Sequence, residues 1–190
     1  MYKAKSYQSL CKITSVSHEL MKNHIKLYHG YVENTNAILL ELRRKNEALL
    51  CRQAVKNRLG WEFSGMRLHE YFFGNLGKTA MIQNGELIDW INHCFGNFDA
   101  WREDFIETAL MRGNGWALLC RDNHTGNLMN LWIQGHATGT LIGCQPLLVL
   151  DAWEHAYMID YGLDRKSYIE RILSDVNWAV VVDRFSKVGV

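Results

Sequence analysis

Apolar residues in the first part of the chain recur with the period of an α-helix. Between Val16 and about Lys56 they fall at intervals of three and four positions, which places them along one helix face. Ser17 stands in front of this pattern, where its hydroxyl can cap the free N–H groups of a helix start. The pattern predicts one long or kinked helix, or two helices in sequence, and a further helix over residues 64–76 that ends at glycines.

Two shorter amphipathic patterns follow a break. Residues 75–85 contain two glycines and no helical period, and they are predicted to form a linker. After it, residues 85–96 and 97–113 each carry apolar side chains at helical spacing, and each segment closes on a glycine. We therefore expect two amphipathic helices here.

The pattern then changes to apolar runs rich in aromatic residues. Residues 115–122 and 127–136 are two such runs joined by Asn-His-Thr-Gly, which predicts a β-hairpin. Leu147–Leu150 predicts a third strand that leads into a helix beginning near Asp151, and a last helix is predicted from about Arg165 to Phe185. Helices first, then helices around a small antiparallel sheet, indicate an α+β fold.

Composition and charge exclude several classes of protein. The 190 residues fit one medium domain or two small lobes that share a core. A formal net charge of +1 argues against a nucleic-acid-binding protein, and no apolar run approaches the length of a membrane span. The five cysteines are scattered and form no C-x-x-C pair, which is typical of reduced thiols in a cytoplasmic protein.

Candidate chemistry begins where the third predicted strand meets the next helix. Asp151 ends the apolar run and His155 follows one helical turn later, so both side chains can reach the same point in space. Two interpretations stay open on these residues alone. Asp151 caps the helix beside a hydrogen-bonded histidine, or both side chains bind a metal ion.

Two more histidines lie on apolar helix faces. His24 shares its face with Leu20, and His69 stands within the apolar stretch G-M-R-L-H-E-Y-F-F. A single histidine on such a face usually bonds a carbonyl group. Two of them together with Asp151 and His155 would supply three imidazoles and one carboxylate, a set that suits iron, manganese or zinc. The lack of a cysteine among them argues against a structural zinc site.

The stretch D-A-W-E-H-A-Y-M-I-D-Y at residues 151–161 resembles the D-x-W-E-H-A-Y signature of the iron/manganese superoxide dismutases. The stretches F-G-N-F-D-A-W-R-E-D-F-I-E-T-A-L-M-R-G-N-G-W-A-L-L-C and D-Y-G-L-D-R-K-S-Y-I-E-R-I-L-S-D-V-N-W are similar to further parts of that family. L-H-E-Y-F-F and H-I-K-L-Y-H-G-Y-V-E-N-T-N resemble its two N-terminal ligand segments. The resemblance covers nearly the whole chain and is weakest over the first fifteen residues.

This resemblance implies a fold and a reaction. The fold is an N-terminal α-helical hairpin, residues 1–80, packed on a C-terminal lobe of helices around a three-stranded antiparallel sheet, residues 81–190. The metal ligands are His24, His69, Asp151 and His155, and the ion is one iron or manganese per chain. The reaction converts superoxide to O₂ and hydrogen peroxide, and the implied assembly is a homodimer or a tetramer.

The first ligand is chosen by helix geometry. In the family a histidine precedes the active-site tyrosine by eight residues, but eight residues before Tyr31 stands Asn23, whereas His24 is seven before it. Seven residues turn an ideal helix by about 700°, roughly 20° short of two full turns, so His24 and Tyr31 face one cavity. His29 is the rival ligand, and it points about 140° away from His24 around the helix.

A glutamine usually bonds the metal-bound solvent in the family. One of its usual positions is Gly65 here, four residues before His69, and the other falls after the second predicted strand, where His136 stands. The resemblance implies His136 as the solvent partner, with Gln134 as the alternative and Tyr31 as the neighbouring proton-relay residue.

Other family positions imply a cavity wall and a subunit interface. The wall residues are Trp116, Trp153 and Phe73, with Leu118 at a position where tryptophan is commoner. The interface residues are Glu154, Tyr157 and Tyr28, with Glu154 reaching the ligand histidine of a second copy and Tyr28 replacing a histidine.

Two other functions remain as alternatives. The first is a metal-free, superoxide-dismutase-like protein with a structural or interaction role, which the presence of all four ligand types argues against. The second is a small-molecule hydrolase that uses the same ligands, but no positioned nucleophile or general base supports it.

Overall fold

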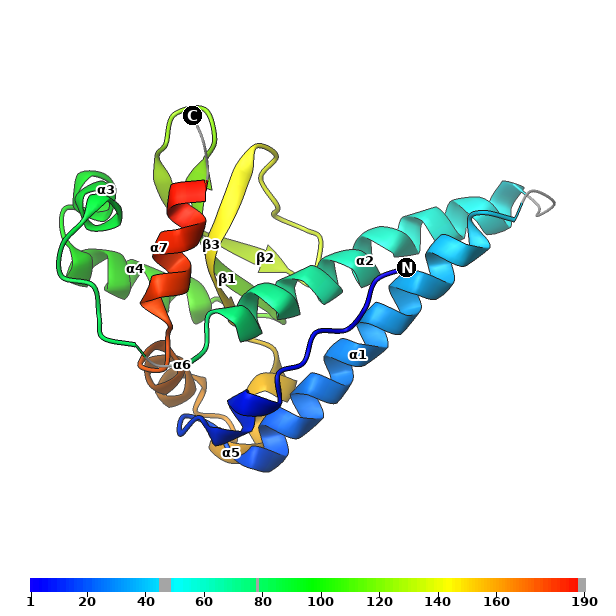
Figure 1. The fold of residues 1–190 in the computed structure, drawn as a ribbon, viewed down its shortest axis with the longest axis horizontal. Coiled ribbons are helices and arrows are strands. Elements are labelled where there is room, and N and C mark those ends of the chain that lie inside the picture. The colour runs from blue at the N-terminus through cyan, green and yellow to red at the C-terminus, as the bar shows by residue number, and fades with distance from the viewer. Residues whose placement is uncertain (45–48, 78, 188–190) are drawn as a thin grey trace.

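A computed structural model describes residues 1–44, 49–77 and 79–187. Two long helices, α1 (His18–Glu41) and α2 (Leu49–Gly74), form an antiparallel hairpin whose far end projects from the rest of the molecule (Figure 1). The Ser17 side chain accepts the backbone N–H of Leu20 at 3.1 Å, so the predicted N-cap is confirmed. Residues 45–48 of the predicted helical region lie outside the described residues.

The predicted start of the second helix is wrong. We expected that helix to begin near residue 64, but α2 begins at Leu49 and is continuous through Gly60. A single exposed glycine costs a helix only about 1 kcal/mol relative to alanine, which is too little to end it. Helices α1 and α2 contact each other in the hairpin, and we infer that these contacts support the longer helix (Figure 1).

The second half confirms the α+β prediction. Helices α3 (Glu86–Phe95) and α4 (Phe98–Ala109) precede strands β1 (Gly115–Asp122), β2 (Leu128–Gln134) and β3 (Cys144–Asp151). Within the described residues the sheet has the order β2-β1-β3, and both of its pairings are antiparallel. Trp116 lies opposite Asp151 in this register, which brings the start of β1 beside the end of β3.

The chain after β3 differs from the prediction. Instead of a helix from Asp151 it forms a 3₁₀ turn, η2 (Glu154–Ala156), and a single helical turn, α5 (Met158–Tyr161). Asp151 is still paired in β3, and its Oδ1 atom accepts the N–H of Trp153 at 2.9 Å, which closes a tight turn. This turn aims both Asp151 and His155 back toward the hairpin.

The last predicted helix is broken in two. Helix α6 (Arg165–Leu173) and helix α7 (Trp178–Lys187) are separated by a short link in which the N–H of Asn177 donates to the carbonyl of Asn75 at 2.6 Å. Leu76 and Val176 form an isolated antiparallel bridge beside it. This non-local pairing outweighs the helical preference of the segment and ties the link to the end of α2. The predicted linker, residues 75–85, follows α2, although its Lys78 lies outside the described residues.

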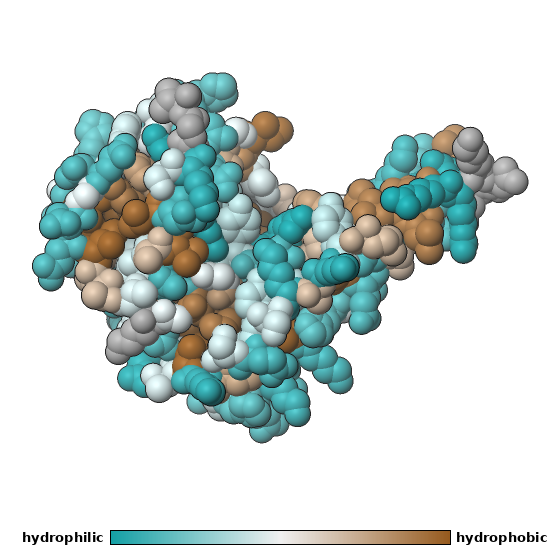
Figure 2. Space-filling model, in the orientation of Figure 1, coloured by the Kyte–Doolittle hydropathy of each residue, from teal (hydrophilic) through white to brown (hydrophobic). Residues whose placement is uncertain are grey.

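The core lies between the sheet and the helices that cover it. Its buried side chains come from both halves of the chain, and α2 packs against β3. The N-terminal segment, which includes the 3₁₀ helix η1 (Gln8–Lys12), runs along the hairpin (Figure 1). Figure 2 shows a mostly hydrophilic face with apolar patches on the body and along the projecting hairpin. None of the described helices is both long and apolar enough to cross a membrane.

Candidate metal centre

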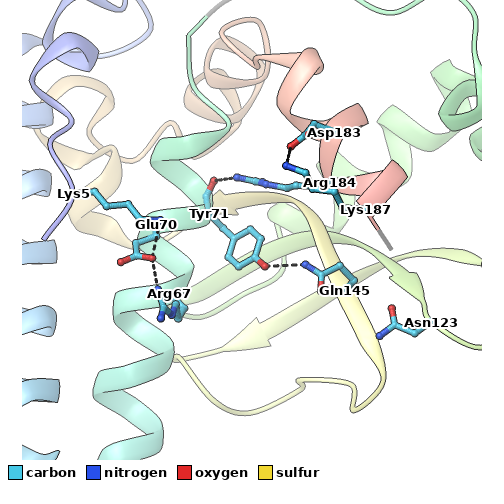
Figure 3. A pocket seen from close by; sticks show the side chains of 9 residues that line it. All are labelled: Lys5, Arg67, Glu70, Tyr71, Asn123, Gln145, Asp183, Arg184 and Lys187. Atoms are coloured by element: carbon cyan, nitrogen blue, oxygen red, sulfur yellow. Dashed lines mark hydrogen bonds and ion pairs between the residues drawn. The ribbon is translucent and has the colours of Figure 1, made fainter. Parts of the chain in front are cut away.

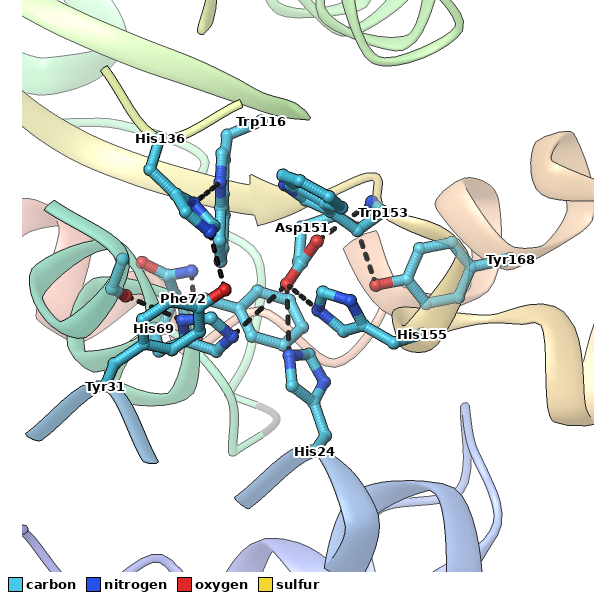
Figure 4. A network of polar contacts seen from close by, with 12 residues as sticks. His24, Tyr31, His69, Phe72, Trp116, His136, Asp151, Trp153, His155 and Tyr168 are labelled. Atoms are coloured by element: carbon cyan, nitrogen blue, oxygen red, sulfur yellow. Dashed lines mark hydrogen bonds and ion pairs between the residues drawn. The ribbon is translucent and has the colours of Figure 1, made fainter. Parts of the chain in front are cut away.

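The four predicted ligands meet at one point. His24 comes from α1, His69 from α2, Asp151 from the end of β3 and His155 from η2, and their ligand atoms lie within 4.8 Å of one another (Figure 4). The Oδ2 atom of Asp151 lies 3.0 Å from His24 Nε2, 3.2 Å from His155 Nε2 and 3.8 Å from His69 Nε2. Segments 127 residues apart are thus joined around one carboxylate oxygen.

These contacts leave one buried ring nitrogen of the cluster, Nε2 of His69, without a hydrogen-bond partner. The Nδ1 atom of His69 lies 2.6 Å from the carbonyl oxygen of Gly65 and must donate a proton to it. In the neutral ring the Nε2 atom then carries only a lone pair, and it is buried without a hydrogen-bond partner. This lone pair faces the Asp151 carboxylate, so two acceptors face each other. A bound cation removes that conflict, and the residues present therefore fit a metal ion.

The charge state of the site also suits a cation. Burial lowers the pKa of His24, and it lowers the pKa of His69 to about 3. Burial works against the charged form of Asp151, yet His155 and His24 outweigh it and hold the pKa of the carboxyl below its usual value. Near neutral pH the site thus offers the neutral imidazoles of His24 and His69 and the carboxylate of Asp151, the protonation states that metal binding requires.

The metal-free protein should lose stability on mild acidification. Burial lowers the pKa of His69 to about 3 and that of His136 to about 4, whereas unfolded imidazoles take up protons near pH 6.5. The unfolded chain therefore binds more protons across this window, and the free energy of unfolding should fall as pH drops from 6.5 to about 4. Urea unfolding of metal-free protein across this range measures the slope. His136→Gln should make the slope shallower, and a pH-independent unfolding free energy would contradict the prediction.

A hydrogen-bonded chain stands beside the cluster. Trp116 Nε1–H donates to His136 Nδ1 at 3.1 Å, so a neutral His136 carries its proton on Nε2, which lies 2.7 Å from the Tyr31 hydroxyl (Figure 4). Burial keeps His136 neutral by lowering its pKa to about 4, and it raises the pKa of Tyr31 to about 12. Tyr31 accepts from His136 and still has its own proton to donate. Gln134, the alternative, is exposed at the end of β2.

The predicted wall residues lie around the histidines. The ring centroid of Trp116 is 4.9 Å from that of His69, that of Trp153 is 5.7 Å from His155, and that of Phe73 is 5.0 Å from His24. Leu118 is buried in β1, where it lies opposite Val149 of β3.

Sequence reasoning missed two aromatic residues of this site. The Trp61 ring lies 4.6 Å from His136, and the Phe72 ring lies 5.3 Å from His24. Both stand on α2, Trp61 eight residues before His69 and Phe72 three after it. For Phe72, one turn from His69, that spacing was the available signal, whereas Trp61 stands about 80° around the helix from His69 and had no such signal.

Gly65 of α2 lies against the Tyr31 ring of α1, and this contact predicts a strong mutational effect. An added Cβ would lie 2.7 Å from Tyr31 Cδ1, so Gly65→Ala should push the ring away from His136. We expect at least a tenfold loss of turnover with metal content retained, measured on reconstituted protein. Gly60→Ala is the matched control in the same helix, because nothing lies within 4 Å of its Cβ position. Equal activity of the two variants would contradict the prediction.

The remaining predicted residues lie at the edge of the site. His29 is exposed and outside the ligand cluster. Glu154 is exposed, and the buried Tyr157 ring stacks on Tyr168 with centroids 5.5 Å apart. Tyr28 is fully buried: its hydroxyl donates to Glu70 at 3.1 Å and accepts the Lys5 N–H at 3.0 Å. The interface role of Tyr28 stays a prediction, and it would require the N-terminal segment to move.

Known proteins resemble this chain along most of its length. The family described as "Iron/manganese superoxide dismutases, C-terminal domain" matches residues 83–184. The chain is 37% identical over 179 residues to "Superoxide dismutase [Fe]" of Pyrobaculum aerophilum, with 90% of this chain and 85% of the relative covered. It is 33% identical over 177 residues to "Superoxide dismutase [Mn] 1" of Halobacterium salinarum, covering 90% and 88%. It is 34% identical over 176 residues to "Superoxide dismutase [Mn/Fe]" of Aeropyrum pernix, covering 89% and 82%.

Proposed function

This chain belongs to the iron/manganese superoxide dismutase family, and we propose that it performs the family's reaction at one iron or manganese ion held by His24, His69, Asp151 and His155. The observation that supports these ligands most directly is the buried Nε2 lone pair of His69, which faces a carboxylate and lacks a hydrogen-bond donor. A protein that used this fold only structurally would be destabilised by such a lone pair, since an unsatisfied buried polar group costs about 1–3 kcal/mol.

The reaction needs two protons and a redox centre that can accept one electron and give it back. An iron or manganese ion held by His24, His69, Asp151 and His155 would supply the one-electron redox chemistry that converts two superoxide ions and two protons into O₂ and hydrogen peroxide. The chain's own residues hold the ion and handle the protons. Tyr31 holds a proton on its hydroxyl, and His136 fixes the direction of that hydroxyl by donating to it at 2.7 Å. Trp116 in turn fixes the tautomer of His136.

The direct test compares metal content with activity. Purified protein should contain about one iron or manganese ion per chain and should dismutate superoxide. Named relatives include iron, manganese and manganese/iron enzymes, so metal-free protein should be reconstituted with each ion separately. Protein that binds neither metal under these conditions and stays folded would instead support the structural alternative.

We also propose that the active form is at least a homodimer. The His155 side chain is 28% exposed, and the neighbouring Glu154 is exposed as well. The Nε2 atom of His155 faces Asp151, so a carboxylate from a second copy could accept a hydrogen bond from the other ring nitrogen, Nδ1, and orient the ring; the family resemblance implies that Glu154 supplies this carboxylate.

Glu154→Ala should therefore weaken the dimer. We expect the dissociation constant, measured by sedimentation velocity over a dilution series, to rise at least tenfold. Glu170→Ala removes another exposed glutamate and serves as the control. Identical sedimentation of the wild type and Glu154→Ala at every concentration would overturn the assignment.

In this proposal the ion lies between two lobes of the chain and the protein lies in the cytoplasm. Residues 1–80 and 81–190 each supply two of the four ligands, so the ion would sit between two lobes. The five cysteines are free thiols, which supports a reducing compartment such as the cytoplasm.

A further inference from the structure

Two cavities outside the metal centre share a wall. The first, called here the apolar cavity, has a volume of about 140 Å³ and is lined largely by apolar side chains of α2 and the sheet, including Phe63, Leu68, Leu118, Leu131, Ile133 and Pro146. The second, the polar cavity, has a volume of about 660 Å³ (Figure 3). Arg67 and Tyr71 of α2 line both of them.

The polar cavity carries more positive than negative charge. Four cationic side chains line it against two carboxylates, Glu70 and Asp183; the cations are Lys5, Arg67, Arg184 and Lys187. Glu70 is shared by Arg67 at 2.6 Å and Lys5 at 3.2 Å. Arg184 donates to neutral oxygens, at 2.6 Å to Asn75 and at 2.7 Å to the carbonyl of Leu147. An anion therefore fits this cavity.

The apolar cavity has the size of one small ring. A cavity of about 150 Å³ lined by aliphatic and aromatic side chains is large enough to hold benzene. Arg67 stands at the boundary, because its guanidinium carbon lies 5.3 Å from the ring centroid of Phe63, which lines the apolar cavity. Tyr71 is held at the same boundary by Gln145, which donates to its hydroxyl at 2.9 Å (Figure 3).

We propose that the two cavities form one binding site for a small carboxylic acid that carries an apolar ring. The ring occupies the apolar cavity beside Leu118, and the carboxylate meets Arg67 at the edge of the polar cavity. An Arg–carboxylate contact supplies orientation, and burial of the ring supplies affinity. The site shares His136 with the hydrogen-bonded chain beside the metal centre but uses none of the four metal ligands, so ligand binding there does not require a bound ion.

Benzoate is the probe for this site, titrated into metal-free and metal-loaded protein by calorimetry. Benzoate should bind both forms. Two control probes should bind at least tenfold more weakly than benzoate: acetate, because it lacks the ring, and benzyl alcohol, because it lacks the charge. Ring signals of His136, which lines the apolar cavity, should shift in the NMR spectrum. Equal binding of the three probes, or no benzoate binding, would overturn the proposal and would leave the dismutase assignment untouched.

Two kinds of variant separate the ring from the carboxylate. Leu118→Trp should fill the apolar cavity and lower the affinity for benzoate at least tenfold. Leu141→Trp should do the same from the exposed rim of the cavity, and it replaces Leu118→Trp if that variant does not fold. Arg67→Met should lower the affinity for benzoate at least tenfold but leave the affinity for benzyl alcohol unchanged. Lys166→Met is the control for loss of a distant surface cation. Unchanged benzoate affinity in the folded Arg67 and Leu141 variants would contradict the site.

Discussion

Replacing His24 with alanine should abolish metal binding, whereas replacing His29 should leave it intact. The two histidines stand five residues apart on α1. His24 is buried and its Nε2 atom lies 3.0 Å from Asp151, while His29 is exposed and outside the ligand cluster. Of the two, His24 is therefore the one that belongs to the proposed ligand set with His69, Asp151 and His155.

The expected effect is large because a four-ligand site loses a quarter of its protein ligands. We expect metal content, measured by elemental analysis, and dismutase activity to fall by more than about 100-fold in His24→Ala, since even residues that only support a ligand cost 10–100-fold. His29→Ala should match the wild type in both. Loss of metal in His29→Ala with retention in His24→Ala would reverse the ligand assignment and with it the seven-residue spacing to Tyr31.

Helical periodicity accounts for the parts of the site that were predictable. His24 and Tyr31 face one cavity because their spacing is close to two full turns, and the structure places both side chains beside His69. The β-hairpin was likewise predictable, because the residues that pair in it are neighbours in the sequence. The local patterns also drew attention to His69, Asp151 and His155 as one possible ligand set, and the family resemblance added the roles of His136 and of the wall and interface residues, which no local pattern states.

Non-local contacts account for what was not predictable. The last helix divides because the N–H of Asn177 pairs with Asn75, about 100 residues away in the sequence, and no local pattern around Asn177 records that partner. The turn after Asp151 has the same cause, since β1 holds Asp151 in an extended conformation through Trp116. Trp61 was missed because its contact with His136 depends on how α2 packs against the loop after β2.

Removal of the metal should lower the melting temperature far more than the loss of any surface contact. The ion would join α1, α2 and the end of β3, where Asp151 already lies 3.0 Å from His24 and 3.2 Å from His155. Without it the buried Nε2 atom of His69 has no partner. At a free metal concentration 1,000 times the dissociation constant, binding stabilises the folded state by about 4 kcal/mol, and for a chain of this size that corresponds to roughly 8–16 °C.

Scanning calorimetry of metal-loaded and chelator-treated protein measures this difference. Asp151→Ala is the control for chelator effects, because a variant that cannot hold the ion should melt at one temperature with or without chelator. The metal-loaded wild type should melt highest, and metal added back to treated wild type should restore its transition. Equal melting temperatures for loaded and metal-free wild type would mean that the ion does not connect the two lobes, and the lone pair of His69 would then need another partner.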